Sequence, residues 1–138
     1  MAGSRYCDLV DIAGIGDRAR GPLAAVVGDY YRSIDRRDLD SALSCFAPDA
    51  VYRRPGYEAL AGIDAILAYY RDERVIAAGR HNIESIVEDA DADEVAVRGS
   101  FSGTSNTGLP LAVRFADFWR FSGLAVVERN TYFDAPAV

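Results

Sequence analysis

The stretch from Leu111 to Phe121 is the most aromatic run in the chain. Successive side chains of a β-strand point to opposite faces, so a strand here sorts these residues into two rows. One row is mostly apolar and contains Leu111, Val113, Phe115, Asp117, Trp119 and Phe121. The other row contains Ala112, Arg114, Ala116, Phe118 and Arg120. The pattern predicts a strand that places the carboxylate of Asp117 among aromatic rings.

Asp117 is therefore the first candidate for a functional residue. A carboxylate held among aromatic rings loses its water, and the neutral acid becomes accessible unless a cation or a hydrogen-bond donor compensates. Such a group can handle a proton or orient a ligand in a pocket. The alternative is structural: a core tyrosine or arginine satisfies the carboxylate. The sequence leaves both open.

Helical spacing of apolar residues predicts three helices in the first half of the chain. The first opens at Gly21-Pro22, since proline is tolerated in a first helical turn, and its spacing directs Tyr30 toward the core. Asp38 caps a second, short helix. A third begins near Ile63 and fades near Gly79.

The period of the pattern changes from helical to strand-like after the third helix. A short strand at 51–54 precedes that helix and places Tyr52 and Arg54 on one side. Four long strands follow the helix, at 81–88, 94–105, 111–121 and 124–133. Helices first and consecutive strands after them predict an α+β domain with an antiparallel meander.

The chain has 138 residues, half of them hydrophobic, which suits a single domain. We expect a flexible N-terminal arm at residues 1–20, with a short helical turn at 6–12, and a domain at 21–138. The net charge of -6 and the pI of about 4.7 argue against nucleic acid or a membrane surface as partners. Cys7 and Cys45 suggest no disulfide framework, and we see no signal peptide or membrane span, so we expect a cytoplasmic protein.

The residue types exclude several chemistries. All 15 basic residues are arginine, so reactions that need a lysine, such as Schiff-base formation, are excluded. A single histidine and scattered carboxylates give no metal-ligand spacing, so we expect no metal. The segment Gly14–Ala19 fails the dinucleotide-binding pattern and follows no strand. We therefore expect no cofactor.

Three motifs carry a resemblance to a known family. Together with the element order, Asp38-Leu39-Asp40, Phe46-Ala47-Pro48-Asp49-Ala50-Val51 and Tyr132-Phe133-Asp134 resemble the nuclear transport factor 2-like superfamily, and more narrowly its SnoaL-like domains, over residues 22–136. The resemblance implies a cone-shaped barrel, in which a strongly curved, mainly antiparallel sheet wraps around three N-terminal helices and encloses an apolar pocket. It also implies a homodimer built by the outer sheet face. The scaffold hosts many reactions and does not identify one.

Ketosteroid isomerases of this superfamily use a tyrosine and a protonated aspartic acid as hydrogen-bond donors to an enolate, and a separate aspartate as the base. By resemblance, Tyr30 and Asp117 take the two donor positions in this chain, whereas Arg54 falls at the position of the base. An arginine does not accept the proton. Steroid-type isomerisation by that route is therefore disfavoured.

Other branches of the superfamily also differ from this chain at a functional position. Where epoxide hydrolases similar to limonene-epoxide hydrolase have a catalytic aspartate, this chain has Thr131. SnoaL-type cyclases favour an aspartate near the end of the last strand, where Asn130 and Thr131 are the nearest polar residues. Residues 52–80 and 98–134 are also similar to small members that accompany enediyne polyketide synthases. This similarity implies antibiotic biosynthesis with a polyketide synthase as a partner.

The remaining site residues are assigned by their chemistry. His81 begins a strand and is a natural proton shuttle, although a histidine there is more often a surface or capping residue. If Arg54 contacts Asp117, the pair is a structural clamp; if it does not, Arg54 can orient a ligand carboxylate or enolate. The other expected substrate-binding residues are Tyr52, Phe115, Trp119, Asn130 and Thr131.

Two functions remain open. The first is a cofactor-independent enzyme of secondary metabolism that acts by proton transfer on a polyketide-like or other apolar carbonyl compound, as an isomerase, cyclase or dehydratase. Its catalytic residues would be Asp117, Tyr30 and His81. The second is a non-catalytic protein that binds a ligand in the pocket or docks a partner on the outer sheet. For both we expect a homodimer and an apolar small molecule in the pocket.

Overall fold

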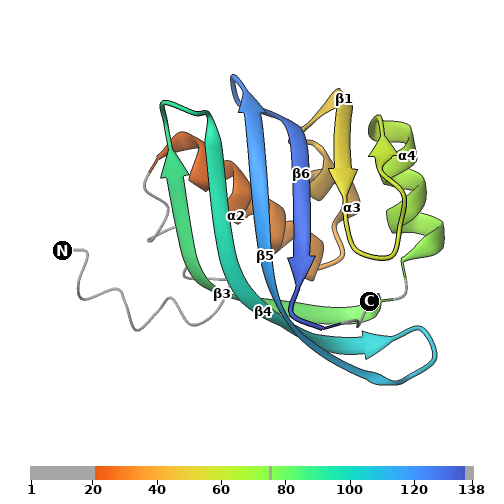
Figure 1. Cartoon of the computed structure of the whole chain (residues 1–138). Coiled ribbons are helices and arrows are strands. Elements are labelled where there is room, and N and C mark those ends of the chain that lie inside the picture. Colours follow the sequence, from red (N-terminus) through yellow and green to blue (C-terminus); the bar gives the residue numbers. More distant parts are fainter. Residues whose placement is uncertain (1–20, 75, 136–138) are drawn as a thin grey trace.

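The computed structural model describes residues 21–74 and 76–135 (Figure 1). Within these ranges, the helices α2 (Pro22–Asp35), α3 (Leu39–Leu43) and α4 (Ile63–Ala68) lie against one face of a six-stranded sheet. The long meander follows them in the chain, which confirms the predicted α+β order. The predicted arm at residues 1–20, its helical turn at 6–12 and Cys7 lie outside the described residues.

The strands are β1 (Phe46–Arg53), β2 (Leu60–Ala61), β3 (Ile76–Asp89), β4 (Glu94–Ser105), β5 (Pro110–Ser122) and β6 (Ala125–Phe133). Their order across the described sheet is β2-β1-β6-β5-β4-β3. Neighbouring strands are antiparallel except for β1 and β6, which run parallel. The sheet curves strongly around the helices but stays open between β2 and β3 (Figure 1). The expected cone is therefore present as a curved open sheet and not as a closed barrel.

Helix α2 begins at Pro22 and has no acidic residue in its first turn. A carboxylate reaches that turn from the sheet, because Glu88 of β3 accepts a hydrogen bond from the backbone N–H of Ala24 at 2.8 Å. This contact satisfies a free donor and suits the positive end of the helix. The predicted cap of α3 is confirmed, since Asp38 accepts a hydrogen bond from the backbone N–H of Ser41.

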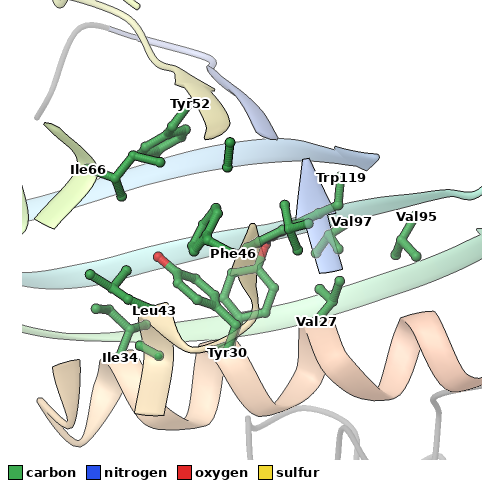
Figure 2. Packing of buried hydrophobic residues seen from close by; sticks show 14 of the residues in the cluster. Val27, Tyr30, Ile34, Leu43, Phe46, Tyr52, Ile66, Val95, Val97 and Trp119 are labelled. Atoms are coloured by element: carbon green, nitrogen blue, oxygen red, sulfur yellow. Dashed lines mark hydrogen bonds between the residues drawn. The ribbon is translucent and has the colours of Figure 1, made fainter. Parts of the chain in front are cut away.

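The alternation predicted for β5 is confirmed. The buried side chains of this strand are Val113, Phe115, Asp117, Trp119 and Phe121. Helix α2 packs onto this inner face and contributes Val27, Tyr30 and Ile34 to the core (Figure 2). The wide burial of α2, with eight buried residues, follows from its place inside a concave sheet.

The structure differs from the prediction after the third helix. Helix α4 ends at Ala68 and continues as a π-helical turn, η3 (Tyr69–Glu73), and β3 then begins at Ile76. Gly79, interpreted as the fading end of a helix, lies within β3. The ring of Phe101 from β4 covers it, and a Cβ atom at position 79 would lie 2.0 Å from Cζ of that ring. The glycine therefore permits a close packing contact within the sheet.

Replacing Gly79 by valine is expected to lower the free energy of unfolding by about 1–3 kcal/mol, because the new side chain displaces the ring of Phe101. Urea unfolding followed by circular dichroism measures this change. Ala78→Val, at the exposed neighbouring position, is the matched control and is expected to change stability by less than about 0.5 kcal/mol. Equal effects of the two substitutions would contradict this account of Gly79.

Candidate active site

The side chain of Asp117 is buried on the inner sheet face, as predicted, and its charge partner is Arg129. Nη2 of Arg129 donates to Oδ2 of Asp117 at 2.9 Å, and the two side chains are 5% and 1% exposed. The register places Asp117 opposite Thr131 and Trp119 opposite Arg129, so the pair is diagonal across β5 and β6. The cation beside Asp117 is therefore Arg129, and not Arg54.

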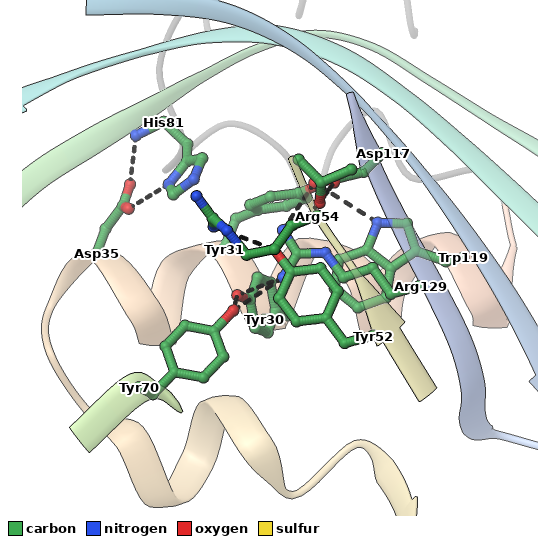
Figure 3. A network of polar contacts seen from close by, with 11 residues as sticks. Tyr30, Tyr31, Asp35, Tyr52, Arg54, Tyr70, His81, Asp117, Trp119 and Arg129 are labelled. Atoms are coloured by element: carbon green, nitrogen blue, oxygen red, sulfur yellow. Dashed lines mark hydrogen bonds and ion pairs between the residues drawn. The ribbon is translucent and has the colours of Figure 1, made fainter. Parts of the chain in front are cut away.

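Three donors surround the carboxylate of Asp117 (Figure 3). The hydroxyl groups of Tyr31 and Thr131 donate to it, in addition to the guanidinium of Arg129. The indole N–H of Trp119 in turn donates to the Tyr31 hydroxyl at 3.3 Å. A carboxylate with three donors and a cationic partner acts as an acceptor. This geometry matches the structural alternative, in which a core tyrosine and an arginine satisfy Asp117, and not a neutral acid that donates to a ligand.

Arg129 lies in a row of aromatic rings that crosses three strands. Tyr52 on β1, Arg129 on β6 and Trp119 on β5 are register partners. The guanidinium carbon is 4.5 Å from the ring centres of Tyr52 and Trp119 and 4.7 Å from that of Tyr30, within cation–π distance. Burial acts to lower the pKa of Arg129, but the Asp117 carboxylate and nearby tyrosines outweigh it, so this pKa lies well above its ordinary value. The interior thus keeps a fixed positive charge.

Two tyrosine hydroxyls meet the other terminal nitrogen of Arg129. Nη1 donates to Oη of Tyr30 at 2.7 Å and to Oη of Tyr70 at 2.9 Å, and the two hydroxyls also hydrogen-bond to each other. Burial raises the pKa of Tyr30 well above its ordinary value, although Arg129 opposes the shift. The phenol of Tyr30 therefore keeps its proton at physiological pH. Nη1 of Arg129 donates to both tyrosine oxygens, and in the bond between the two hydroxyls either one can be the donor. When Tyr30 donates, Arg129 and Tyr30 are a pair of donors that converge on the oxygen of Tyr70.

His81 faces the same interior and is held by a carboxylate. Oδ1 of Asp35 lies 2.6 Å from Nδ1 of His81, and Oδ2 accepts a hydrogen bond from the backbone N–H of His81 at 2.8 Å. The ring of His81 packs against Tyr31, Phe101 and Phe115. A carboxylate at Nδ1 favours the tautomer with the proton on that nitrogen, which leaves Nε2 as the basic atom. Asp35 and His81 thus form a dyad suited to proton transfer.

These groups border a small internal cavity of about 30 Å³, which has room for about one water molecule. The interior is therefore largely filled by side chains, and the expected apolar hollow is a narrow cleft lined by both polar and apolar side chains. A second depression of about 100 Å³ is also lined by Tyr70, Arg74 and Ile76, which border the first cavity as well. Ligands larger than a water molecule need a side chain to move.

The structure brings most of the predicted site residues together. Those that border the cavity are Tyr30, Tyr52, Arg54, His81, Phe115, Asp117 and Thr131. Trp119, expected as a ligand wall, is fully buried against Arg129 and lies outside the cavity lining. Asn130, expected in substrate binding, contacts Arg53 and Glu128 on the opposite face of β6, because strand alternation turns it away from Thr131.

The sequence analysis missed four residues of the site, namely Arg129, Tyr31, Asp35 and Tyr70. Arg129 and Thr131 are two residues apart on one strand, so their side chains face the same side of the sheet. This alternation would have identified Arg129 if the pairing of β5 with β6 had been known. Tyr31 and Asp35 are four residues apart on α2 and therefore share a helix face. The sheet curves around α2 and therefore covers two faces of this helix, the one that carries Tyr30 and the one that carries Tyr31 and Asp35. The second face belongs to the site for this reason.

Other chemistries find no site in the described part of the chain. No cluster of three or more histidine, cysteine or acidic side chains there is placed to hold a metal ion. Burial raises the pKa of the Cys45 thiol to about 12, which makes it a poor nucleophile. No helix between residues 21 and 135, as far as the structure describes them, is long and apolar enough to cross a membrane.

Comparison with known families gives one match that covers most of the chain. The model of the SnoaL-like domain matches residues 27–129, a range that includes Asp35, His81, Asp117 and Arg129. A comparison with curated proteins gives no significant match.

Several solved structures share the fold at low sequence identity. An NTF2-like protein of unknown function from Burkholderia pseudomallei is 24% identical, covers 83% of this chain and 92% of its own, and has a TM-score of 0.76. TerC, co-crystallised with polyporic acid, is 22% identical over 83% and 92% of the two chains, with a TM-score of 0.71. A candidate polyketide cyclase from Pseudomonas putida is 16% identical over 83% and 92%, with a TM-score of 0.70. At these identities the likeness shows the NTF2-like fold alone.

Breaking the buried ion pair is expected to cost more than removing it. Arg129→Met alone should lower the free energy of unfolding by about 3–5 kcal/mol, because Asp117 then stays buried without a cation. The double variant Arg129→Met, Asp117→Leu should lose clearly less than the sum of the two single variants. Urea unfolding of the wild type and the three variants measures this coupling. Strictly additive losses would show that the two charges do not depend on each other.

Proposed function

The chain belongs to the SnoaL-like domain family, and on that basis we propose that it is an enzyme of secondary metabolism that moves a proton, without a cofactor, on a polyketide-like or other apolar carbonyl compound. The observation that carries the proposal is that His81, held by Asp35, borders the same cavity as the donors Arg129 and Tyr30. A base and a pair of donors in one cavity are the two parts that enolisation requires. The reaction classes that fit are isomerase, cyclase and dehydratase.

In the proposed step, Nε2 of His81 removes a proton from the carbon next to the substrate carbonyl. The C–H bond breaks, its electron pair forms the C=C bond of an enolate, and the proton moves to Nε2. The carbonyl oxygen gains the negative charge, which Nη1 of Arg129 and the hydroxyl of Tyr30 stabilise. Asp35 stabilises the imidazolium that forms. Return of the proton to another carbon completes an isomerisation. Its transfer to a β-hydroxyl that leaves as water completes a dehydration.

Asp117 is a positioning residue in this scheme. It holds Nη2 of Arg129 at 2.9 Å, so Nη1 of the same guanidinium stays directed at the tyrosine hydroxyls. The predicted catalytic importance of Asp117 is kept, but the residue acts through Arg129. Substrate contacts are assigned to side chains that border the cavity, which are Arg54, Tyr52, Phe115 and Thr131.

Proteins with the same fold support a small organic substrate. TerC was co-crystallised with polyporic acid, and the Pseudomonas putida protein is a candidate polyketide cyclase. Both descriptions fit a scaffold that handles small organic ligands. A polyketide synthase that supplies the substrate is part of this proposal.

Solvent-deuterium exchange tests the proton-transfer step before the natural substrate is known. Wild-type protein is expected to catalyse exchange at the acidic carbon of a member of a panel of cyclic 1,3-diketones and conjugated enones, followed by NMR. His81→Gln should slow this exchange by about 10²–10⁴-fold, because the base is lost. Asp35→Asn should also slow it, and Asp49→Asn, at an exposed position, should not. Full exchange by the His81 variant would overturn the assignment of the base.

A second candidate function is a non-catalytic protein that binds a ligand in the cavity or serves as an accessory protein in a pathway. It is favoured by Arg54 and Thr131, which stand where related enzymes have a catalytic aspartate. Under this alternative, a compound from the same panel raises the melting temperature but shows no exchange above the uncatalysed rate.

We also propose that the chain forms a homodimer through the outer face of the sheet. Phe118 and Tyr132 are 40% and 57% exposed there and contact each other edge to face at 5.9 Å. The register extends this apolar patch across β4 to the exposed Val87 of β3. The charges around the patch are paired within the chain, Arg98 and Arg114 with Glu84 and Glu128 with Arg120, so no large field of one sign opposes the approach of a second copy.

Phe118→Glu is expected to convert the dimer to a monomer, because it places a charge at the centre of the apolar patch that the dimer would bury. Sedimentation velocity of the wild type and the variant measures the change. Leu109→Glu, at another exposed apolar residue that lies in the β4–β5 turn, is the control and should leave the dimer intact. A monomeric wild type at high concentration would refute the dimer.

A further inference from the structure

Tyr70 stands between two hollows of the described structure. Its side chain, together with Arg74 and Ile76, borders both the inner cavity of about 30 Å³ and the second depression of about 100 Å³. Tyr70 belongs to the π-helical turn η3, a rare conformation that is frequent at functional sites. Rotation of this one side chain would join the two hollows.

The hydroxyl of Tyr70 occupies the point at which the donors of the inner cavity converge (Figure 3). It accepts a hydrogen bond from Nη1 of Arg129 at 2.9 Å and shares a second one with the hydroxyl of Tyr30. Nη2 of Arg129 is fixed by Asp117, so the direction of Nη1 does not depend on Tyr70. The donor pair would therefore remain in place if the Tyr70 oxygen left.

The ring of Tyr70 lies in a flat aromatic slot. The ring of Tyr52 is parallel to it within 8°, with 6.4 Å between the centres, and the ring of Tyr69 meets it edge-on at 5.1 Å. The guanidinium carbon of Arg74 is 5.4 Å from the centre of the Tyr70 ring. The site thus already accommodates a planar ring with a weakly acidic oxygen, which is the phenol of Tyr70.

We propose that Tyr70 is an internal stand-in for the ligand. A planar, conjugated ligand displaces it and places an enolate or phenolate oxygen on Nη1 of Arg129 and the hydroxyl of Tyr30, while the Tyr70 side chain turns into the outer depression. This inference rests on the proposed function and deepens it, because it names the substrate class: compounds whose acidic oxygen is attached to a flat conjugated system. A charged oxygen binds a guanidinium more strongly than the neutral phenol of tyrosine does, so the exchange favours the ligand.

Binding of 4-nitrophenol to variants of Tyr70 tests this inference without any turnover. Tyr70→Phe keeps the ring but gives up its hydrogen bonds, so the probe should bind about tenfold more tightly than to wild type. Tyr70→Ala also empties the slot, and the probe should bind more tightly still. The visible absorbance of the nitrophenolate reports its charge, and the bound probe should ionise at a lower pH than the free probe because it faces Arg129.

Three controls distinguish a specific oxygen subsite from an empty space of the same size. Tyr69→Ala removes a neighbouring, buried tyrosine that has no hydrogen bond with Arg129 among the described contacts, and it should not promote ionisation of the probe. Adding Tyr30→Phe to Tyr70→Ala should weaken probe binding by about tenfold, because one donor is lost. 4-Nitrotoluene, which lacks the oxygen, should bind the Tyr70→Ala variant much more weakly than 4-nitrophenol does.

The inference is overturned if folded Tyr70→Phe and Tyr70→Ala proteins, verified by circular dichroism, bind the probe no better than wild type. Equal binding of 4-nitrotoluene and 4-nitrophenol would overturn the oxygen subsite. Failure of the proposed function looks different. In that case the probe binds and ionises as described, but deuterium exchange is absent or insensitive to His81→Gln.

Discussion

The buried ion pair between Asp117 and Arg129 is the interaction on which the interior of this protein depends. Either charge alone would be costly to bury, and the pair is tolerated because most of its bonding capacity is met. Tyr31 and Thr131 donate to the carboxylate, the two terminal nitrogens of Arg129 donate to Asp117, Tyr30 and Tyr70, and aromatic rings flank the guanidinium. The register of three strands sets this arrangement, since Tyr52, Arg129 and Trp119 lie in one row. The pairing of the strands therefore fixes the position of the Arg129 guanidinium, and with it the direction of the nitrogen that donates into the cavity.

This arrangement divides the work of the candidate site between two clusters. The sheet contributes a fixed cation and its positioning carboxylate, and α2 contributes the tyrosine donors and Asp35, which holds His81 of β3. A carboxylate that already accepts three hydrogen bonds is a poor proton shuttle, so the proposed base of the site is the histidine. The interior is almost filled, and the side chain that closes it, Tyr70, is the one whose oxygen meets both donors. Binding and opening of the site are therefore the same event in the proposed scheme.

Strand alternation was enough to predict that Asp117 is buried and that the side chains of Tyr52 and Arg54 lie on the same side. The turn residues that flank β4 were enough to predict its bounds. The partner of Asp117 could not be predicted, because it depends on the register of β5 with β6, which shifts at an irregularity between Arg120 and Phe121. On residue type alone, Arg54 was a reasonable candidate for the cation that pairs with Asp117. Gly79 was misinterpreted for a related reason, since its neighbour Phe101 comes from a different strand. The size of the cavity depends on how Tyr30, Tyr52 and Tyr70 pack, and no local sequence pattern carries that information.

The parallel pairing of β1 with β6 joins the first strand of the described chain to the last one. On a ribosome, β1 and the helix after it are made long before the strand that must lie beside them, and this separation makes the contact slow to form. Arg129 arrives on that same late strand. A nascent chain that has been synthesised only as far as β5 therefore has the carboxylate of Asp117 without its cation. It also has two unpaired strand edges, those of β1 and β5, between which β6 must be inserted. Completion of the last strand fills the gap and neutralises the core in one step.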